Sequence, residues 1–278
     1  MRTAGLSLPI SIALASAAVA ISACGATDKA KNAVDPVAQA AEVTQNSGTA
    51  EVTFHGSVVT SGRTVPIDGQ GVVDTRGGRA QLSFRFARKG KTVEMDEILA
   101  GKTLYLGGDV VKRGLPSGKS WAKLDLAKLA AKAGIDTSSF DSGGSSASEL
   151  LRYLRGAGSV RKEGSEKVSG ASTTHYHAVA DTAKLAAERG DENFAASMRK
   201  LRAEIKGPMK LDVWIDSAHR VRQEKVDYTT VANGQSVRSA FTMQFTRFGV
   251  PIKLDTPPKD DTRDMTDEVL SQVGRRSP

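Results

Sequence analysis

The chain has 278 residues, a formal net charge of +8 and one cysteine. A single cysteine excludes an intramolecular disulfide, so the fold has to be stabilised by its core. The basic residues are interleaved with apolar ones, as in residues 85–91 and 199–206, and this spacing favours a solvated face over nucleic-acid binding. It is also compatible with a weak attraction to anionic lipid head groups, at about 1 kcal/mol for each Lys or Arg near the membrane.

The N-terminal segment has the layout of a secretory signal. Arg2 is positive, residues 4–21 are apolar and uncharged, and small residues precede Cys24. The segment is short and weakly hydrophobic for a membrane span. The run Ile-Ser-Ala-Cys-Gly at 21–25 resembles a bacterial lipobox, in which the cysteine receives a diacylglyceryl group and a signal peptidase cuts before it. We therefore predict a signal peptide over 1–23 and lipidation of Cys24. A chance cysteine behind an ordinary signal and a buried core cysteine are the alternatives.

The mature chain begins with a tether and a short helix. Residues 24–34 are small and polar, which predicts a lipidated N-terminus followed by a flexible tether. Asp35 and Pro36 are typical of an N-cap and a first helical position, and the helix should end near Gln45. The remaining sequence predicts a single domain over 35–258 and a charged, frayed tail over 259–278, in which residues 265–269 could add a helical turn.

A period of two dominates the residues that follow. Leu82, Phe84 and Phe86 alternate with polar residues, and similar runs occur between positions 52 and 106. Glycine-rich breaks at 61–62, 76–78, 89–90 and 107–108 separate these runs at hairpin spacing. The pattern predicts an antiparallel meander with one wet face and one apolar face.

Helical spacing returns in the middle of the chain. It occurs at 124–133 and at 182–205, where Phe194, Met198 and Leu201 fall on one helix face. Further strands are expected at 168–179 and 211–245. Two or three short helices are too few to cover both faces of a sheet of about ten strands. We therefore predict an α+β fold: a strongly curved antiparallel sheet, or half-open β-barrel, with the helices packed on its concave side.

Four groups of residues carry a family resemblance. They are Leu-Tyr-Leu at 104–106 with Trp-Ala-Lys-Leu at 121–124, residues 164–170 with Thr-Thr-His-Tyr at 173–176, Val-Trp-Ile-Asp at 213–216 with Arg-Val-Arg at 220–222, and Phe-Gly-Val-Pro-Ile at 248–252 ending in Pro-Pro at 257–258. In this order they resemble the LppX/LprA/LprF/LprG lipoprotein family of actinobacterial envelopes and, more distantly, the LolA/LolB lipoprotein-carrier fold. The resemblance implies a half-open barrel, a cavity for acyl chains and a role in carrying lipids or lipoglycans. No ligand-specific motif carries over.

Inward-facing apolar residues are the candidates for such a cavity, and an ordinary filled core is the alternative for each of them. Met and Phe suit a site that adapts to flexible chains. Each buried methylene contributes about 0.8 kcal/mol, so no charged anchor is required. The candidates are Leu82, Phe84, Phe86, Met95, Leu104, Leu106, Leu150, Leu154, Phe194, Met198, Leu201, Phe241, Met243 and Phe245.

The sequence offers little for catalysis or metal binding. His175 and His177 share one strand face but lack a third ligand, so we predict no metal and no cofactor. No Gly-x-Ser-x-Gly turn or glycine-rich phosphate loop is present, and we predict no enzymatic activity. A hydrolase of envelope lipids or glycans is the least favoured function.

These features together predict a lipoprotein anchored on the extracytoplasmic face of the cell membrane. It would bind acyl chains of a lipid or lipoglycan in an apolar cavity and carry or present them in the envelope. An envelope transporter or another protein is a possible partner, and nucleic acid is not. The alternative is a structural or sensory lipoprotein that uses the same scaffold to bind a protein.

Overall fold

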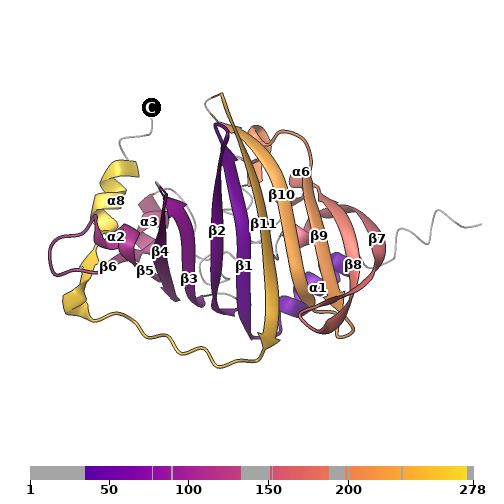
Figure 1. Ribbon diagram of the computed structural model, residues 1–278, viewed down its shortest axis with the longest axis horizontal. Helices are drawn as coiled ribbons and strands as arrows, with labels where there is room; N and C mark the ends of the chain where they lie inside the picture. Colours follow the sequence, from indigo (N-terminus) through magenta and orange to yellow (C-terminus); the bar gives the residue numbers. More distant parts are fainter. Residues whose placement is uncertain are drawn as a thin grey trace, which may run out of the picture. The chain divides into compact units, whose positions relative to one another are not determined.

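Figure 1 shows the computed structural model of the protein, which describes residues 35–273 apart from positions 77, 89, 133–150, 152, 188–197, 200 and 233. The strands are β1 (Thr49–Thr60), β2 (Arg63–Asp74), β3 (Arg79–Arg88), β4 (Lys91–Ala100), β5 (Thr103–Gly107), β6 (Trp121–Asp125), β7 (Ala157–Val168), β8 (Ala171–Ala180), β9 (Met209–Asp216), β10 (Val221–Ala232), β11 (Gln235–Phe248) and β12 (Thr262–Asp264). The helices are α1 (Pro36–Gln45), α2 (Asp109–Lys112), α3 (Leu126–Lys132), α6 (Thr182–Ala186) and α8 (Thr266–Val273), with a 3-10 turn η1 (Lys259–Asp261).

The described strands form one open sheet in the order β12-β6-β5-β4-β3-β2-β1-β11-β10-β9-β8-β7. All neighbouring pairs are antiparallel except β12 and β6, which run parallel. Bulges occur in the β1–β11, β9–β10 and β7–β8 pairs, and bulges bend and twist a sheet. The predicted α+β fold with an open, curved antiparallel sheet and few helices is confirmed (Figure 1).

One face of the sheet, here called the inner face, carries the hydrophobic core. Fully buried residues from α1 and from the central strands belong to one cluster, which includes Val37, Leu99, Leu211 and Phe245. The opposite, outer face carries polar pairs such as the hydrogen bond between the His55 ring and the Asp68 carboxylate. Strand alternation therefore separates the two faces as predicted.

Helix α1 lies against the β7, β9 and β10 end of the inner face. The Asp35 carboxylate caps it by accepting a hydrogen bond from the Val37 N–H at 2.9 Å. Near its other end, the buried Thr44 hydroxyl donates to the Ala40 carbonyl and accepts from the Val221 N–H, both at 2.7 Å. The second bond ties the helix directly to the first residue of β10.

The segment after Pro258 corrects the prediction of a frayed tail. Residues 259–273 form η1, β12 and α8, and β12 pairs with β6 at the edge of the sheet. The Ser120 N–H donates to the Asp261 carboxylate at 2.9 Å, and hydrogen bonding by Thr266 lowers the pKa of Asp264 to about 2. The C-terminal segment thus completes the sheet.

The helical predictions hold in part. The segment at 124–133 stays in strand β6 through Asp125 and becomes helix α3 at Leu126. In the segment at 182–205, α6 begins after the capping residue Asp181, whose carboxylate accepts from the Ala183 N–H at 2.9 Å. Residues 188–197 of that segment lie outside the described part of the chain.

Candidate functional site

A row of directly paired residues crosses the inner face from β8 to β4. Neighbouring members are register partners on adjacent strands, so their side chains share this face. At about 4.8 Å per strand the row spans about 34 Å along the sheet. We call it the inner row, and its members are Tyr176, Val213, Glu224, Met243, Phe54, Gly69, Phe84 and Met95.

Phenylalanine rings lie over glycines in the middle of this face. The Phe54 ring meets Phe84 edge-on at 6.0 Å and stacks on Phe241 at 5.3 Å between centroids. A Cβ on Gly69 would lie 2.6 Å from Cδ1 of Phe84, and a Cβ on Gly56 would overlap the Phe241 ring. The rings therefore occupy space that side chains at these two positions would need.

The inner face is almost closed beside this aromatic group. A hollow of about 10 Å³ is lined by inner-face side chains that include Val52, Leu82 and Met243. This volume is near the ~10–15 Å³ that one water requires, whereas ligand pockets typically measure about 300–1,000 Å³. An acyl chain can enter this part of the face only if side chains move.

A larger opening lies at the α1 end of the inner face, and we call it the mouth. Its volume is about 390 Å³, and its walls combine the first turn of α1 with the ends of β7, β8 and β9. Pro36 and Gln39 line it from the helix. Tyr176, the first member of the inner row, also lines it. The mouth therefore adjoins the first member of the inner row. Its remaining lining residues are Ser165, Ser172, Thr173, Thr174, Ile215, Asp216, Ser217 and His219.

The predicted cavity residues lie in several places. Leu82, Leu154, Met198, Met243 and Phe245 are buried in the core. Phe84 and Leu201 are half-buried against it. Phe86, Met95, Leu104, Leu106 and Phe241 are half-buried, and strand register puts them on the face that carries Leu82. Leu150 and Phe194 lie outside the described residues. The structure thus places the described strand residues of this set on the inner face, and their role as a lipid cavity stays a prediction.

Glu224 is a member of the inner row that the sequence prediction missed. Its side chain is 1% exposed, and its partners on either side are Val213 and Met243. Among the described residues, neither carboxyl oxygen has a hydrogen-bond partner. Burial raises the pKa of Glu224 to about 8, so the carboxyl is largely protonated at neutral pH.

Glu97 is a second carboxyl on the inner face, at a different place. Glu97 lies on β4, which is four strands away from β11 in the sheet. It pairs with Leu82 on β3 and with Leu106 on β5. Burial raises its pKa too, although the side chain is only partly covered. Glu97 therefore offers a natural comparison for Glu224.

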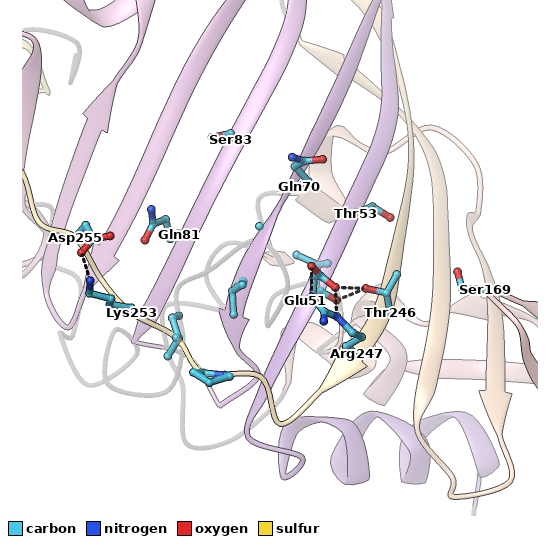
Figure 2. Close-up of a pocket in the computed structure, with 15 residues that line it drawn as sticks. Glu51, Thr53, Gln70, Gln81, Ser83, Ser169, Thr246, Arg247, Lys253 and Asp255 are labelled. Atoms are coloured by element: carbon cyan, nitrogen blue, oxygen red, sulfur yellow. Dashed lines mark hydrogen bonds and ion pairs between the residues drawn. The ribbon is translucent and has the colours of Figure 1, made fainter.

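The outer face carries a polar groove of about 850 Å³ (Figure 2). Pro251, Ile252, Lys253 and Asp255 line it together with Gln70, Gln81 and Ser83 of β2 and β3. At one end the Arg247 guanidinium donates to the Glu51 carboxylate at 2.6 and 2.9 Å and lowers the pKa of Glu51. Polar side chains and a tight ion pair give this groove the character of a wet surface.

The histidine pair predicted to be metal-free is held by an aspartate on the outer face. His175 and His177 both contact Asp212, at 3.1 and 3.0 Å, and the His175 ring stacks on Trp214 at 4.3 Å. Among the described residues, no group of three or more His, Cys, Asp and Glu side chains is arranged to hold a metal ion. No helix in that same part of the chain has the length and apolar character of a membrane span.

Comparison with known proteins gives distant similarities. No family model matches the chain. An uncharacterised 31.2 kDa protein of Streptomyces griseus, from the rplA–rplJ intergenic region, is 24% identical over 204 residues, which are 71% of this chain and only 61% of that protein. Among solved structures, LprF of Mycobacterium bovis is 14% identical, with 80% of this chain and 95% of that chain covered and a TM-score of 0.42. Lipoprotein LppX of Mycobacterium tuberculosis is 15% identical, with 80% and 100% covered and a TM-score of 0.42.

LprF and LppX both belong to the family that the sequence resembles.

Proposed function

We propose that the protein is a lipid-anchored envelope lipoprotein, without enzymatic activity, that binds acyl chains of a lipid or lipoglycan along the inner row. The observation that carries this proposal is the mouth of about 390 Å³, which shares Tyr176 with a row of mainly apolar side chains. Its volume falls within the range of ligand sites. Acyl chains are the ligand class that an extended apolar surface of this kind can bury.

Under this proposal the predicted anchor would bring the mouth near a membrane. Pro36 lines the mouth, and the predicted lipidation site Cys24 precedes it by 12 positions in the sequence. A short flexible tether would keep the mouth close to the membrane surface that supplies or receives the lipid. The extracytoplasmic location is part of the same proposal.

Binding requires the closed middle of the inner face to open. The Phe84 ring covers Gly69 and the Phe241 ring covers Gly56, so turning these rings exposes backbone that has no side chain above it. Met95 and Met243 flank the aromatic group and can follow the shape of a ligand. About 0.8 kcal/mol for each buried methylene offsets the rearrangement.

Lipid exchange tests the proposal. The chain carrying Cys24→Ala lacks the anchor, so any lipid found on it by native mass spectrometry after incubation with phosphatidylcholine vesicles is a ligand. Ser165→Trp fills the mouth at an exposed position and should slow lipid uptake at least tenfold. Ser57→Trp, placed on the outer face of β1, is the matched control. No bound lipid on the Cys24→Ala chain would contradict the proposal.

The second candidate is a structural or sensory lipoprotein that binds a protein. The almost closed part of the inner face beside the aromatic group favours it, because a filled core is what such a role requires. Among the described residues, however, Val231 is the large hydrophobic side chain that stands out as exposed, at 37%, and one residue makes no apolar patch. Recovery of a stable protein partner from cross-linked cells, together with absence of lipid exchange, would favour this candidate.

A further inference from the structure

Glu224 departs from the usual behaviour of buried polar groups. Buried side-chain polar atoms almost always have a hydrogen-bond partner, and exceptions call for an explanation such as a functional role or a missing ligand. Both oxygens of Glu224 are buried, and neither has a hydrogen-bond partner in the part of the chain that the structure describes. The side chains of its register partners, Val213 and Met243, have no group that forms a strong hydrogen bond with a carboxyl.

Arg222, two residues before Glu224 on the same strand, makes its contacts elsewhere. Arg222 donates from Nη2 to the Thr246 carbonyl at 2.8 Å, and its guanidinium lies 5.5 Å from the centre of the Phe248 ring. A bulge between Val221 and Gln223 also breaks the regular alternation at this point of β10. Among the described residues, Arg222 therefore does not compensate the Glu224 carboxyl.

A protonated carboxyl in an apolar surface is a hydrogen-bond donor. Burial alone raises the pKa of Glu224 to about 8, with no contribution from another charge or hydrogen bond. In its neutral form the group has one O–H to donate and a carbonyl oxygen to accept with. The lipid group that best matches this O–H donor is an uncharged oxygen that is a strong hydrogen-bond acceptor.

The surroundings of Glu224 give a bound lipid a direction. On the mouth side, Val213 and Tyr176 separate Glu224 from the polar residues of the mouth by two strand spacings, about 10 Å. On the other side, the inner row continues with Met243, Phe54 and Phe84 and has no polar side chain as far as Met95. The polar mouth, the Glu224 carboxyl and the apolar part of the inner row follow one another along the sheet. This is also the order of the head group, the ester and the acyl chain in a lipid.

Resting on the proposed function, we propose that the Glu224 carboxyl donates a hydrogen bond to the ester carbonyl of a bound acyl lipid, so that the site selects ester-linked over ether-linked lipids. The head group lies toward the mouth and the chain runs along the inner row toward Met95. Glu224 is then a specificity-determining residue of the site.

A matched pair of lipids tests this selection. The Cys24→Ala chain is mixed with equal amounts of dioleoylglycerol and its ether analogue dioleylglycerol in dodecyl maltoside micelles, and the bound ratio is read by native mass spectrometry. A hydrogen bond made to only one of the two lipids is worth about a tenfold preference. We expect about tenfold more ester than ether bound to this parent chain.

Three further variants connect the preference to the side chain. Glu224→Met, which keeps the size and removes the donor, should bring the ratio to about one while lipid is still bound. Glu224→Gln keeps an N–H donor and should retain part of the preference. Glu97→Gln changes the other inner-face carboxyl and should leave the ratio as it is.

Infrared spectra of dioleoylglycerol with ¹³C-labelled carbonyls supply an independent readout. The ester band of the bound lipid should shift to lower frequency in the parent chain and lose that shift in Glu224→Met. Equal binding of both lipids by the parent chain, or a full preference in Glu224→Met, would overturn the inference and leave the proposed function standing. Binding of neither lipid would overturn both.

Discussion

Glu224 and Asp227 lie three residues apart on β10 and have opposite surroundings. Glu224 points to the inner face, where burial without a partner raises its pKa to about 8. Asp227 points to the outer face, where the Arg238 guanidinium donates to it at 2.6 and 3.1 Å and lowers its pKa. The same chemical group is thus a neutral donor on one face and a paired anion on the other. The face of the sheet, set by strand alternation, decides which.

The largest expected effect tests whether the inner face alone carries the core. Phe245→Ala removes a fully buried ring that stacks on Phe248 at 6.1 Å between centroids. We expect the free energy of unfolding to fall by about 3–5 kcal/mol, measured by urea denaturation. Lys225→Ala, at an exposed position of the outer face, should change it by less than about 0.5 kcal/mol. Similar losses for the two variants would contradict the division between the faces.

The next largest effect is a rise in the free energy of unfolding instead of a fall. Glu224→Met replaces an unpaired buried carboxyl with an apolar side chain of similar size, so the free energy of unfolding should rise by about 1–3 kcal/mol at pH 5. The folded protein keeps the Glu224 proton between the ordinary pKa of 4.5 and about 8, whereas the unfolded chain releases it. The parent protein therefore loses stability as the pH rises through this interval, and the variant escapes that loss.

The gain from Glu224→Met should accordingly be larger at pH 9 than at pH 5. Urea denaturation of parent and variant at both pH values measures the difference, and titrations that the two proteins share cancel in it. Glu97→Gln provides the comparison with a carboxyl that is only partly buried. An equal gain at both pH values would show that Glu224 does not keep its proton.

Local pattern was enough to predict the faces of most strands. The alternation of Leu82, Phe84 and Phe86 reports directly which side chains share a face, because a strand has a period of two. The pairing of Ala50 with Phe248, which joins β1 to β11, has no such local signature. The C-terminal strand β12 has three residues, too few for any pattern to show.

Charge and irregularity explain two further misses. Strand β7 was expected only near its end, because its residues 161–167 are mostly charged or small, as is typical of an edge strand. At the start of β10 the bulge places both Val221 and Glu224 on the inner face although they are three residues apart. Strict alternation of side chains, followed backward from Val226, places Glu224 on the inner face. The same alternation followed forward from Val221 places Glu224 on the outer face, because it does not allow for the bulge.

A buried polar group that does have partners should behave in the reverse way to Glu224. Thr44 is fully buried, and its hydroxyl accepts from the Val221 N–H and donates to the Ala40 carbonyl. Thr44→Val keeps the shape and leaves the Val221 N–H unpaired, so the free energy of unfolding should fall by about 1–3 kcal/mol. Hydrogen exchange at the Val221 amide should speed up in the variant. A stabilised Thr44→Val protein would remove the contrast with Glu224.

The smallest effect belongs to the outer-face carboxylate. Asp227→Asn removes the charge that Arg238 binds, and since this pair is solvated we expect the free energy of unfolding to fall by less than about 1 kcal/mol at pH 7. Because the folded pKa of Asp227 lies below its ordinary value of 3.8, the pair stabilises the fold above that value and ceases to do so as the pH falls through the folded pKa. The gap between parent and variant should therefore narrow toward pH 2, and 1 M salt should narrow it at pH 7. A gap between parent and Asp227→Asn that widens in acid would mean that Asp227 is not a paired anion. The two faces of β10 would then not differ in how they treat a carboxyl group.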